Sequence, residues 1–118
     1  MGYRSQIALA IAKEDCKYLK GKMKENKELK DFLKMAEIKK SNNAIVISWD
    51  WIKWYDEFPE VRAIKDFMYY LSDNDRPYRF IRIGEENDDT EIETNYGDGD
   101  NYNIVDAIDI YRGIDINI

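Results

Sequence analysis

The 118-residue sequence contains no histidine, a single cysteine and two prolines. Histidine is the commonest general acid–base group and metal ligand, so its absence removes every Ser–His and Cys–His nucleophile pair. A zinc site would have to combine one thiolate with carboxylates, which is an unusual ligand set. The composition therefore predicts a protein that is not an enzyme and that holds no cofactor or metal.

Long apolar runs are also missing. The longest covers about six residues, 7–12, whereas a membrane-spanning helix needs about 20. Arg4 and Gln6 interrupt the segment that comes nearest to a signal peptide. The lone Cys16 excludes a disulfide within the chain and is typical of a reducing compartment. These features predict a cytoplasmic protein with no membrane partner.

Apolar residues recur with the period of a strand in some segments and with the period of a helix in others. Alternation indicates strands whose bulky faces turn toward the helices. The predicted strands are 2–12, 44–54, 78–83, 90–94 and 104–111. Helical stripes cover 13–35, with a break expected near Gly21 and 24–27, and run from Pro59 to the polar cluster 72–77.

The resulting order, β-α(α)-β-α-β-β-β, predicts one α+β domain over residues 1–118. The expected architecture is a two-layer sandwich, in which a mostly antiparallel sheet of about five strands carries two to three helices on one face. Alternation places Trp49 and Trp51 on the same face of their strand, where they belong to the core or form an aromatic shelf for a base or a partner's side chain. Trp54 and Tyr55 lie at the end of that strand beside Asp56 and Glu57, and they are the better candidates for a partner interface.

Negative charge is concentrated late in the chain. Residues 73–118 contain 13 acidic and 4 basic residues, whereas residues 1–72 contain 11 acidic and 14 basic ones. Carboxylates alternating along a hairpin approach the charge density of DNA, which carries one charge per about 1.7 Å of axis. The stretch 85–100 has eight acidic residues and no basic one: Glu85, Glu86, Asp88, Asp89, Glu91, Glu93, Asp98 and Asp100. It predicts either a nucleic-acid mimic or a solvated sheet edge.

A mimic of this kind would bind a host protein that has a basic groove, and would not bind nucleic acid itself. Apolar contacts with the partner are expected from Trp54, Tyr55 and Tyr96. The segregation of acidic and basic residues along the chain also allows a homodimer.

Residues 13–40 contain ten lysines and six acidic residues, which is typical of solvated helix faces. The alternative is that this segment binds phosphate or docks onto the acidic half of a second copy.

Two other functions fit parts of the sequence. If Arg4, Arg79 and Arg82 come together on their strands, they form an anion pocket that would bind a small molecule or a nucleotide signal, with tryptophans for stacking. Neutralisation of the acidic hairpin is the competing interpretation of these arginines. The acidic residues could instead hold Mg²⁺ in a metal-dependent nuclease, although their field repels such a substrate.

Three blocks of sequence have a recognisable spacing. They are MGYRS at 1–5, WIKWY at 51–55 followed by FPEV at 58–61, and FIRIGE at 80–85 followed by DD at 88–89 and EIE at 91–93. With these blocks the chain resembles a family of small, uncharacterised phage and prophage proteins. The resemblance implies a phage origin but no particular activity. By analogy with phage inhibitors of host defence, anti-CRISPR proteins among them, it favours an inhibitor that acts in the host cytoplasm.

Overall fold

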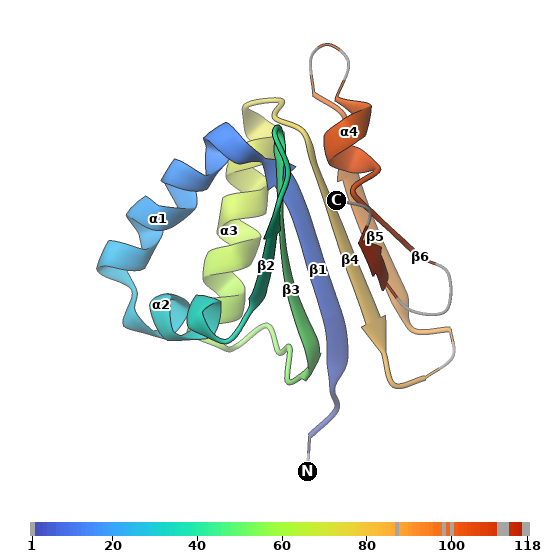
Figure 1. Ribbon diagram of the computed structural model, residues 1–118. Helices are drawn as coiled ribbons and strands as arrows, with labels where there is room; N and C mark the ends of the chain where they lie inside the picture. Colours follow the sequence, from blue (N-terminus) through green and yellow to red (C-terminus); the bar gives the residue numbers. More distant parts are fainter. Residues whose placement is uncertain (1, 87, 98, 100, 111–113, 117–118) are drawn as a thin grey trace.

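The computed structural model describes residues 2–86, 88–97, 99, 101–110 and 114–116. Five antiparallel strands form one sheet in the order β2-β3-β1-β4-β5 (Figure 1). The strands are β1 (Ser5–Ala12), β2 (Glu37–Lys40), β3 (Ala44–Ile52), β4 (Tyr78–Gly84) and β5 (Thr90–Asn95). The helices on one face are α1 (Cys16–Glu25), α2 (Lys27–Lys34) and α3 (Pro59–Asp73), with a 3-10 turn, η1 (Lys13–Asp15), before α1. The predicted α+β fold is confirmed. No helix in the described ranges is long and apolar enough to cross a membrane.

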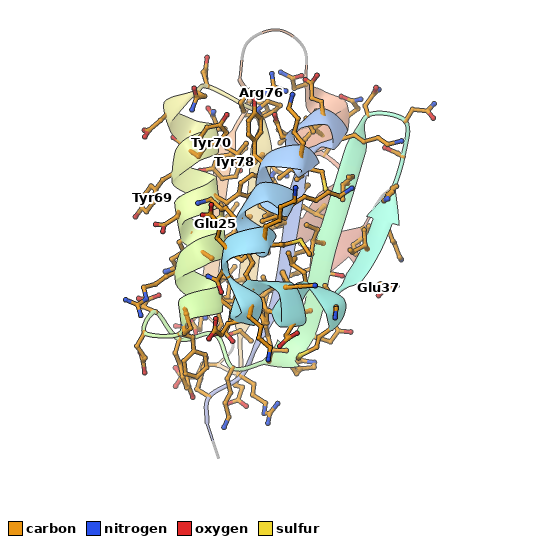
Figure 2. The ribbon with its side chains drawn as sticks, turned by 90° about the vertical axis from the view of Figure 1, so that its left-hand side faces the viewer. Glu25, Glu37, Tyr69, Tyr70, Arg76 and Tyr78 are labelled. Carbon is orange, nitrogen blue, oxygen red and sulfur yellow. The ribbon has the colours of Figure 1, made fainter. Side chains whose placement is uncertain are left out.

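The helices cover the bulky face of the sheet (Figures 1 and 2). Leu9 and Ile11 of the central strand β1 are fully buried against them. Apolar residues of α3 at helical spacing, Ile64, Phe67 and Leu71, pack on the sheet and are also fully buried. Fully burying one such side chain contributes about 1.5–3 kcal/mol, so this layer is the main source of stability.

An ion pair fixes the start of the helical layer. Arg76, which follows α3, places its Nε 2.9 Å from Oδ2 of Asp15 in η1, and it also pairs with Glu14. The Asp15 side chain is only 4% exposed, so this contact satisfies a buried charge. Arg76 lies at the end of the helical layer where α3 ends (Figure 2).

On the opposite face of the sheet β1 and β3 carry small residues, and this face is covered as well. Ala8 and Ala10 of β1 point there and are fully buried, together with Val46 of β3. Ile104 and Ile108 of the C-terminal segment pack on them. The short alanine side chains let this third layer lie close to the sheet (Figure 1).

The C-terminal segment differs from the single strand predicted over 104–111. It begins as a short helix, α4 (Tyr102–Val105), and continues as β6 (Ile108–Ile110), which pairs with β7 (Ile114–Ile116). The prediction was wrong for the first part because isoleucines four residues apart fit a helical face as well as a strand.

Two further differences concern the segment after β1. The helical region breaks at Asn26, within the predicted stretch 24–27, whereas Gly21 stays inside α1. The Asn26 side chain accepts a hydrogen bond from the Leu29 N–H (3.0 Å) and so caps α2. Residues 37–40, to which the sequence assigns no element, form the edge strand β2.

Candidate partner-binding surface

In the loop between β4 and β5 the structure describes residues 85, 86, 88 and 89, and one network of charged and polar side chains fixes Asp89. Asp89 accepts hydrogen bonds from the Tyr3 hydroxyl (2.5 Å) and from Nη2 of Arg82 (2.7 Å). Nε of Arg82 lies 3.6 Å from the carboxylate of Glu91. The Arg82 guanidinium, and after it the Tyr3 hydroxyl, lower the pKa of Asp89 to about 2. The network therefore ties the loop to the N-terminal segment and to the two strands that it connects.

Gly84 ends β4 directly against this network. A Cβ at Gly84 would lie far inside van der Waals contact of both Oδ2 of Asp89 and the Tyr3 hydroxyl oxygen. A larger residue would therefore displace both groups. The tyrosine of the first sequence block and the glycine and second aspartate of the third block thus belong to one structural feature.

We expect the protein to lose stability as the pH falls from about 4 to 2. The pKa of Asp89 is about 2 in the folded protein and ordinarily 3.8, so the unfolded chain binds this proton first. The stabilisation by Asp89 is complete above that ordinary value and is lost as the pH falls through the folded pKa. Asp89→Asn should reduce the pH dependence, measured by acid unfolding with tryptophan fluorescence.

The matched control for this experiment is Asp73→Asn at the exposed end of α3. Asp73 forms no ion pair with any of the described side chains. The Asp73→Asn variant should keep the acid-unfolding profile of the unaltered protein. Equal profiles for the two variants would contradict the role given to Asp89.

The eight carboxylates predicted as partner contacts fall into three groups. Asp89 and Glu91 are half-buried and held by Arg82. Asp98 and Asp100 lie outside the described residues. Four are exposed and make no ion pair within the part of the chain that the structure describes: Glu85, Glu86, Asp88 and Glu93. They lie on or just before the outer strand β5, which has β4 as its one neighbour in the five-stranded sheet.

Trp54, predicted to be a partner contact, is buried. It is 8% exposed, and its ring lies 6.4 Å from that of Trp49 and 5.7 Å from that of Phe80, centroid to centroid. After β3 the chain turns back toward α3, which carries the indole beneath the helices rather than past the end of the sheet. Trp54 therefore supports the core and is not available as a surface anchor.

Trp51 takes the exposed position instead. The register of β1 against β3 shifts between Ser5 and Ile7, so an extra residue is accommodated in β3. Such a bulge interrupts the alternation that predicted Trp51 to share a face with Trp49. Trp51 is 48% exposed and has a φ of 52°. A bulky residue rarely adopts this conformation, which costs about 1–3 kcal/mol and is often found at functional sites.

Trp51 and the loop 85–89 lie at the same end of the sheet. Ser5 of β1 pairs with Ile52 on one side and with Gly84 on the other. Two strand spacings separate the ends of β3 and β4, which is about 10 Å. We call Trp51 together with Glu85, Glu86 and Asp88 the acidic end of the sheet.

The two tyrosines predicted as anchors lie at different places. Tyr55 is half-buried near the acidic end, where its ring meets Phe58 edge-on and its hydroxyl lies against Gly2. Tyr96 is 47% exposed but follows β5 at the end far from the loop. The six residues of β5 span about 20 Å, so Tyr96 does not share a contact surface with Trp51.

The three arginines do not form the predicted anion pocket. Arg82 pairs with Ile7, whose side chain faces the helices, whereas Arg79 pairs with Ala10, whose side chain faces the other layer. Residues directly opposite in a sheet share a face, so these two guanidinium groups point to opposite sides. Arg79 and Arg4 each donate to a backbone carbonyl, at 3.3 and 3.1 Å. Arg82 neutralises carboxylates, as the competing interpretation has it.

No group of three or more metal-ligating side chains lies close together among the described residues. The alternative of a metal-dependent nuclease therefore gains no support from the side-chain arrangement.

Comparisons with models of known protein families, with curated proteins and with solved structures gave no significant match. The resemblance to phage proteins thus rests on the three sequence blocks alone.

Proposed function

We propose that this chain is a non-enzymatic inhibitor of phage or prophage origin, which binds a basic groove of a host defence protein. The observation that carries the proposal is the acidic end, where three exposed carboxylates without ion pairs to described residues share one end of the sheet with an exposed tryptophan. Complementary charge speeds association, while a buried aromatic anchor supplies affinity.

A solvated edge accounts for the carboxylates but not for Trp51. Acidic residues on an open strand prevent pairing with other sheets, and they do so without any aromatic neighbour. An indole held at positive φ and left 48% exposed carries a conformational cost with no gain in burial. A partner that covers the indole would recover apolar burial from it, which supports a contact surface at this end.

The target expected from this chemistry is a protein whose lysines and arginines normally hold nucleic acid. We expect capture of the tagged chain from bacterial lysate to retain such a protein at low salt, about 0.05 M, and to release it near 0.5 M, where the screening length falls to a few ångströms. Added DNA or RNA should compete with the chain for the same groove. Retention of a protein regardless of salt and nucleic acid would contradict the proposal. Recovery of the tagged chain with no host protein bound would also contradict it.

A further inference from the structure

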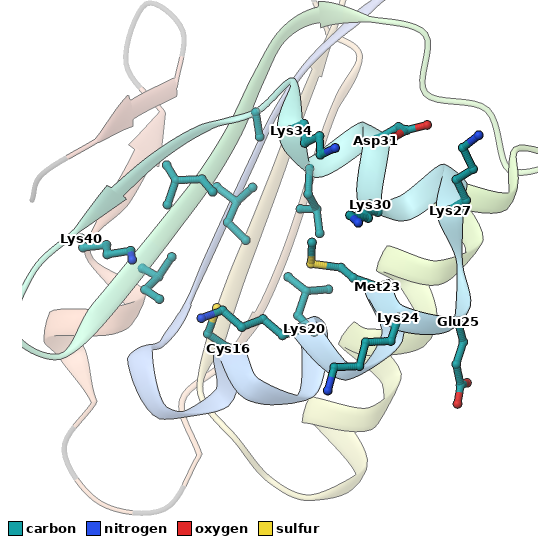
Figure 3. Close-up of a pocket in the computed structure, with 16 residues that line it drawn as sticks. Cys16, Lys20, Met23, Lys24, Glu25, Lys27, Lys30, Asp31, Lys34 and Lys40 are labelled. Carbon is teal, nitrogen blue, oxygen red and sulfur yellow. The ribbon is translucent and has the colours of Figure 1, made fainter.

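A cavity of about 1070 Å³ lies at the other edge of the sheet, between α1, α2 and the strands β2 and β3 (Figure 3). It forms because the helices cover β1 and β3 but stop short of β2, whose four residues are all exposed. Eight apolar residues line it: Cys16, Leu19, Met23, Leu33, Ala36, Ile38, Ile45 and Ile47. The cavity therefore offers a continuous apolar wall that opens to solvent.

Positive charge surrounds this wall. Six lysines line the cavity from α1, α2 and β2: Lys20, Lys24, Lys27, Lys30, Lys34 and Lys40. None of them forms an ion pair with a described carboxylate. Glu25 and Asp31 also line the cavity, but their carboxylates turn away from its centre (Figure 3). In a chain with a net charge of −6, this excess of ammonium groups creates a local field that attracts anions.

The wall lacks the groups that most biological ligands require. Its lining consists of eight apolar and eight charged residues, with no aromatic and no neutral polar side chain. A nucleotide would find no ring to stack on and no amide or hydroxyl to read its base edge. A peptide would bring an N–H and a C=O with every residue, and the lining offers them no neutral polar side chain, which leaves the backbone edge of β2. An alkyl chain with one anionic group at its end needs only methylene contacts and ammonium groups.

We propose that this cavity binds a single-chain anionic amphiphile, such as the carboxylate of a long-chain fatty acid. The alkyl chain lies along the apolar wall, and the headgroup is held by ammonium groups that include Lys20 of α1 and Lys40 of β2. The cavity volume, about 1070 Å³, lies just above the usual range of small-molecule sites, about 300–1,000 Å³. The cavity lies at the β2 edge of the sheet, whereas the three carboxylates of the acidic end follow β4 on the far side of β1. The proposed site is independent of the proposed inhibitor function.

Cys16 provides a readout inside the site, because it lines the cavity and is the single cysteine of the chain. Tetradecanoate, kept below its aggregation concentration, should slow modification of Cys16 by a thiol reagent. Affinity along the series hexanoate, octanoate and decanoate should rise about three- to fourfold per methylene group, as expected for burial of a CH₂ group. Dodecyltrimethylammonium, a cation with a comparable chain, should give no protection.

Two charge variants test the headgroup. Lys20→Glu with Lys40→Glu should weaken binding of decanoate by at least about tenfold, because charge-assisted contacts are lost and repulsion is added. Lys17→Glu with Lys39→Glu makes the same change of charge on the same two elements outside the cavity, and should leave affinity within about twofold. Lys17 lies over the Tyr18 ring and Lys39 lies 3.8 Å from Glu37.

Several outcomes would overturn the proposal. These are equal protection of Cys16 by the cationic amphiphile, an affinity that does not depend on chain length, and equal losses in the two charge variants. Protection by an acidic peptide but not by fatty acids would identify the cavity as a groove for a strand added to β2 instead. The ligand series uses the unaltered protein, so these outcomes can be read even if a variant does not fold.

Discussion

The triple variant Glu85→Lys, Glu86→Lys, Asp88→Lys should bind the captured host protein at least about 100-fold more weakly than the unaltered chain. Close charge pairs across an interface have coupling energies of about 1.5–7 kcal/mol, and reversal turns attraction into repulsion. Because the three side chains are exposed, the free energy of unfolding should change by no more than about 0.5 kcal/mol per site. Titration calorimetry with the purified partner and urea unfolding measure the two effects.

The control for this reversal is Glu28→Lys, Asp66→Lys, Asp73→Lys. These exposed residues lie on α2 and α3, so the control changes the net charge equally but on the helical layer. Long-range steering should alter its association rate by a few-fold, with little change in the dissociation rate. An equal loss of affinity in both variants would mean that the change in net charge alone weakens binding, wherever the charges lie. Unchanged affinity in the loop variant would mean that Glu85, Glu86 and Asp88 form only a solvated edge.

The two tryptophans near the end of β3 should respond to truncation in opposite ways. Trp54→Ala should lower the free energy of unfolding by about 3–5 kcal/mol, because a buried indole between Trp49 and Phe80 is replaced by a cavity. Trp51→Ala should leave the free energy of unfolding within about 0.5 kcal/mol of the unaltered value, because its indole is exposed. Urea unfolding monitored by circular dichroism measures both.

Binding should show the reverse pattern. Trp51→Ala should weaken partner binding by about 2 kcal/mol, or roughly 30-fold, as truncation of a central aromatic anchor does. Trp54→Phe keeps most of the buried volume and serves as the control, with near-normal affinity expected. A stable Trp54→Ala variant that fails to bind would restore the sequence-based assignment of Trp54 to the surface. A destabilised Trp51→Ala variant would contradict the assignment of Trp51 to the surface.

Periodicity predicts the main elements of this fold because each of them buries one face. The alternation around Leu9 and the helical stripe that follows Pro59 both correspond to contacts in the one core between the sheet and the helices. The third layer escapes prediction, although Ala8 and Ala10 carry a signal for it. A strand face made of alanines rather than charged residues does not need water, and it permits a close neighbour. The sequence around Ala8 and Ala10 does not indicate that this neighbour is the C-terminal segment.

The position of the acidic hairpin is predictable from composition, but the division of its charges is not. Asp88 and Asp89 look alike in the sequence, yet Asp88 is exposed, whereas Asp89 is held by Arg82 and by a tyrosine 86 residues away. The exchange of roles between Trp51 and Trp54 has a similar cause. A single extra residue in β3 reverses which side chains face the core, and the sequence pattern does not mark where that residue enters.

The central place of β1 has a consequence for synthesis on the ribosome. Both neighbours of β1 are made after it, and Ser5 finds its second partner only at Gly84. Ribosomes add about 5–20 residues per second, so about 4–14 s pass between synthesis of the apolar run 7–12 and synthesis of β4. Sheets closed by such distant pairings fold slowly, over milliseconds to seconds. Until β4 is made, the nascent chain presents to chaperones an apolar strand that lacks at least one of its two neighbours.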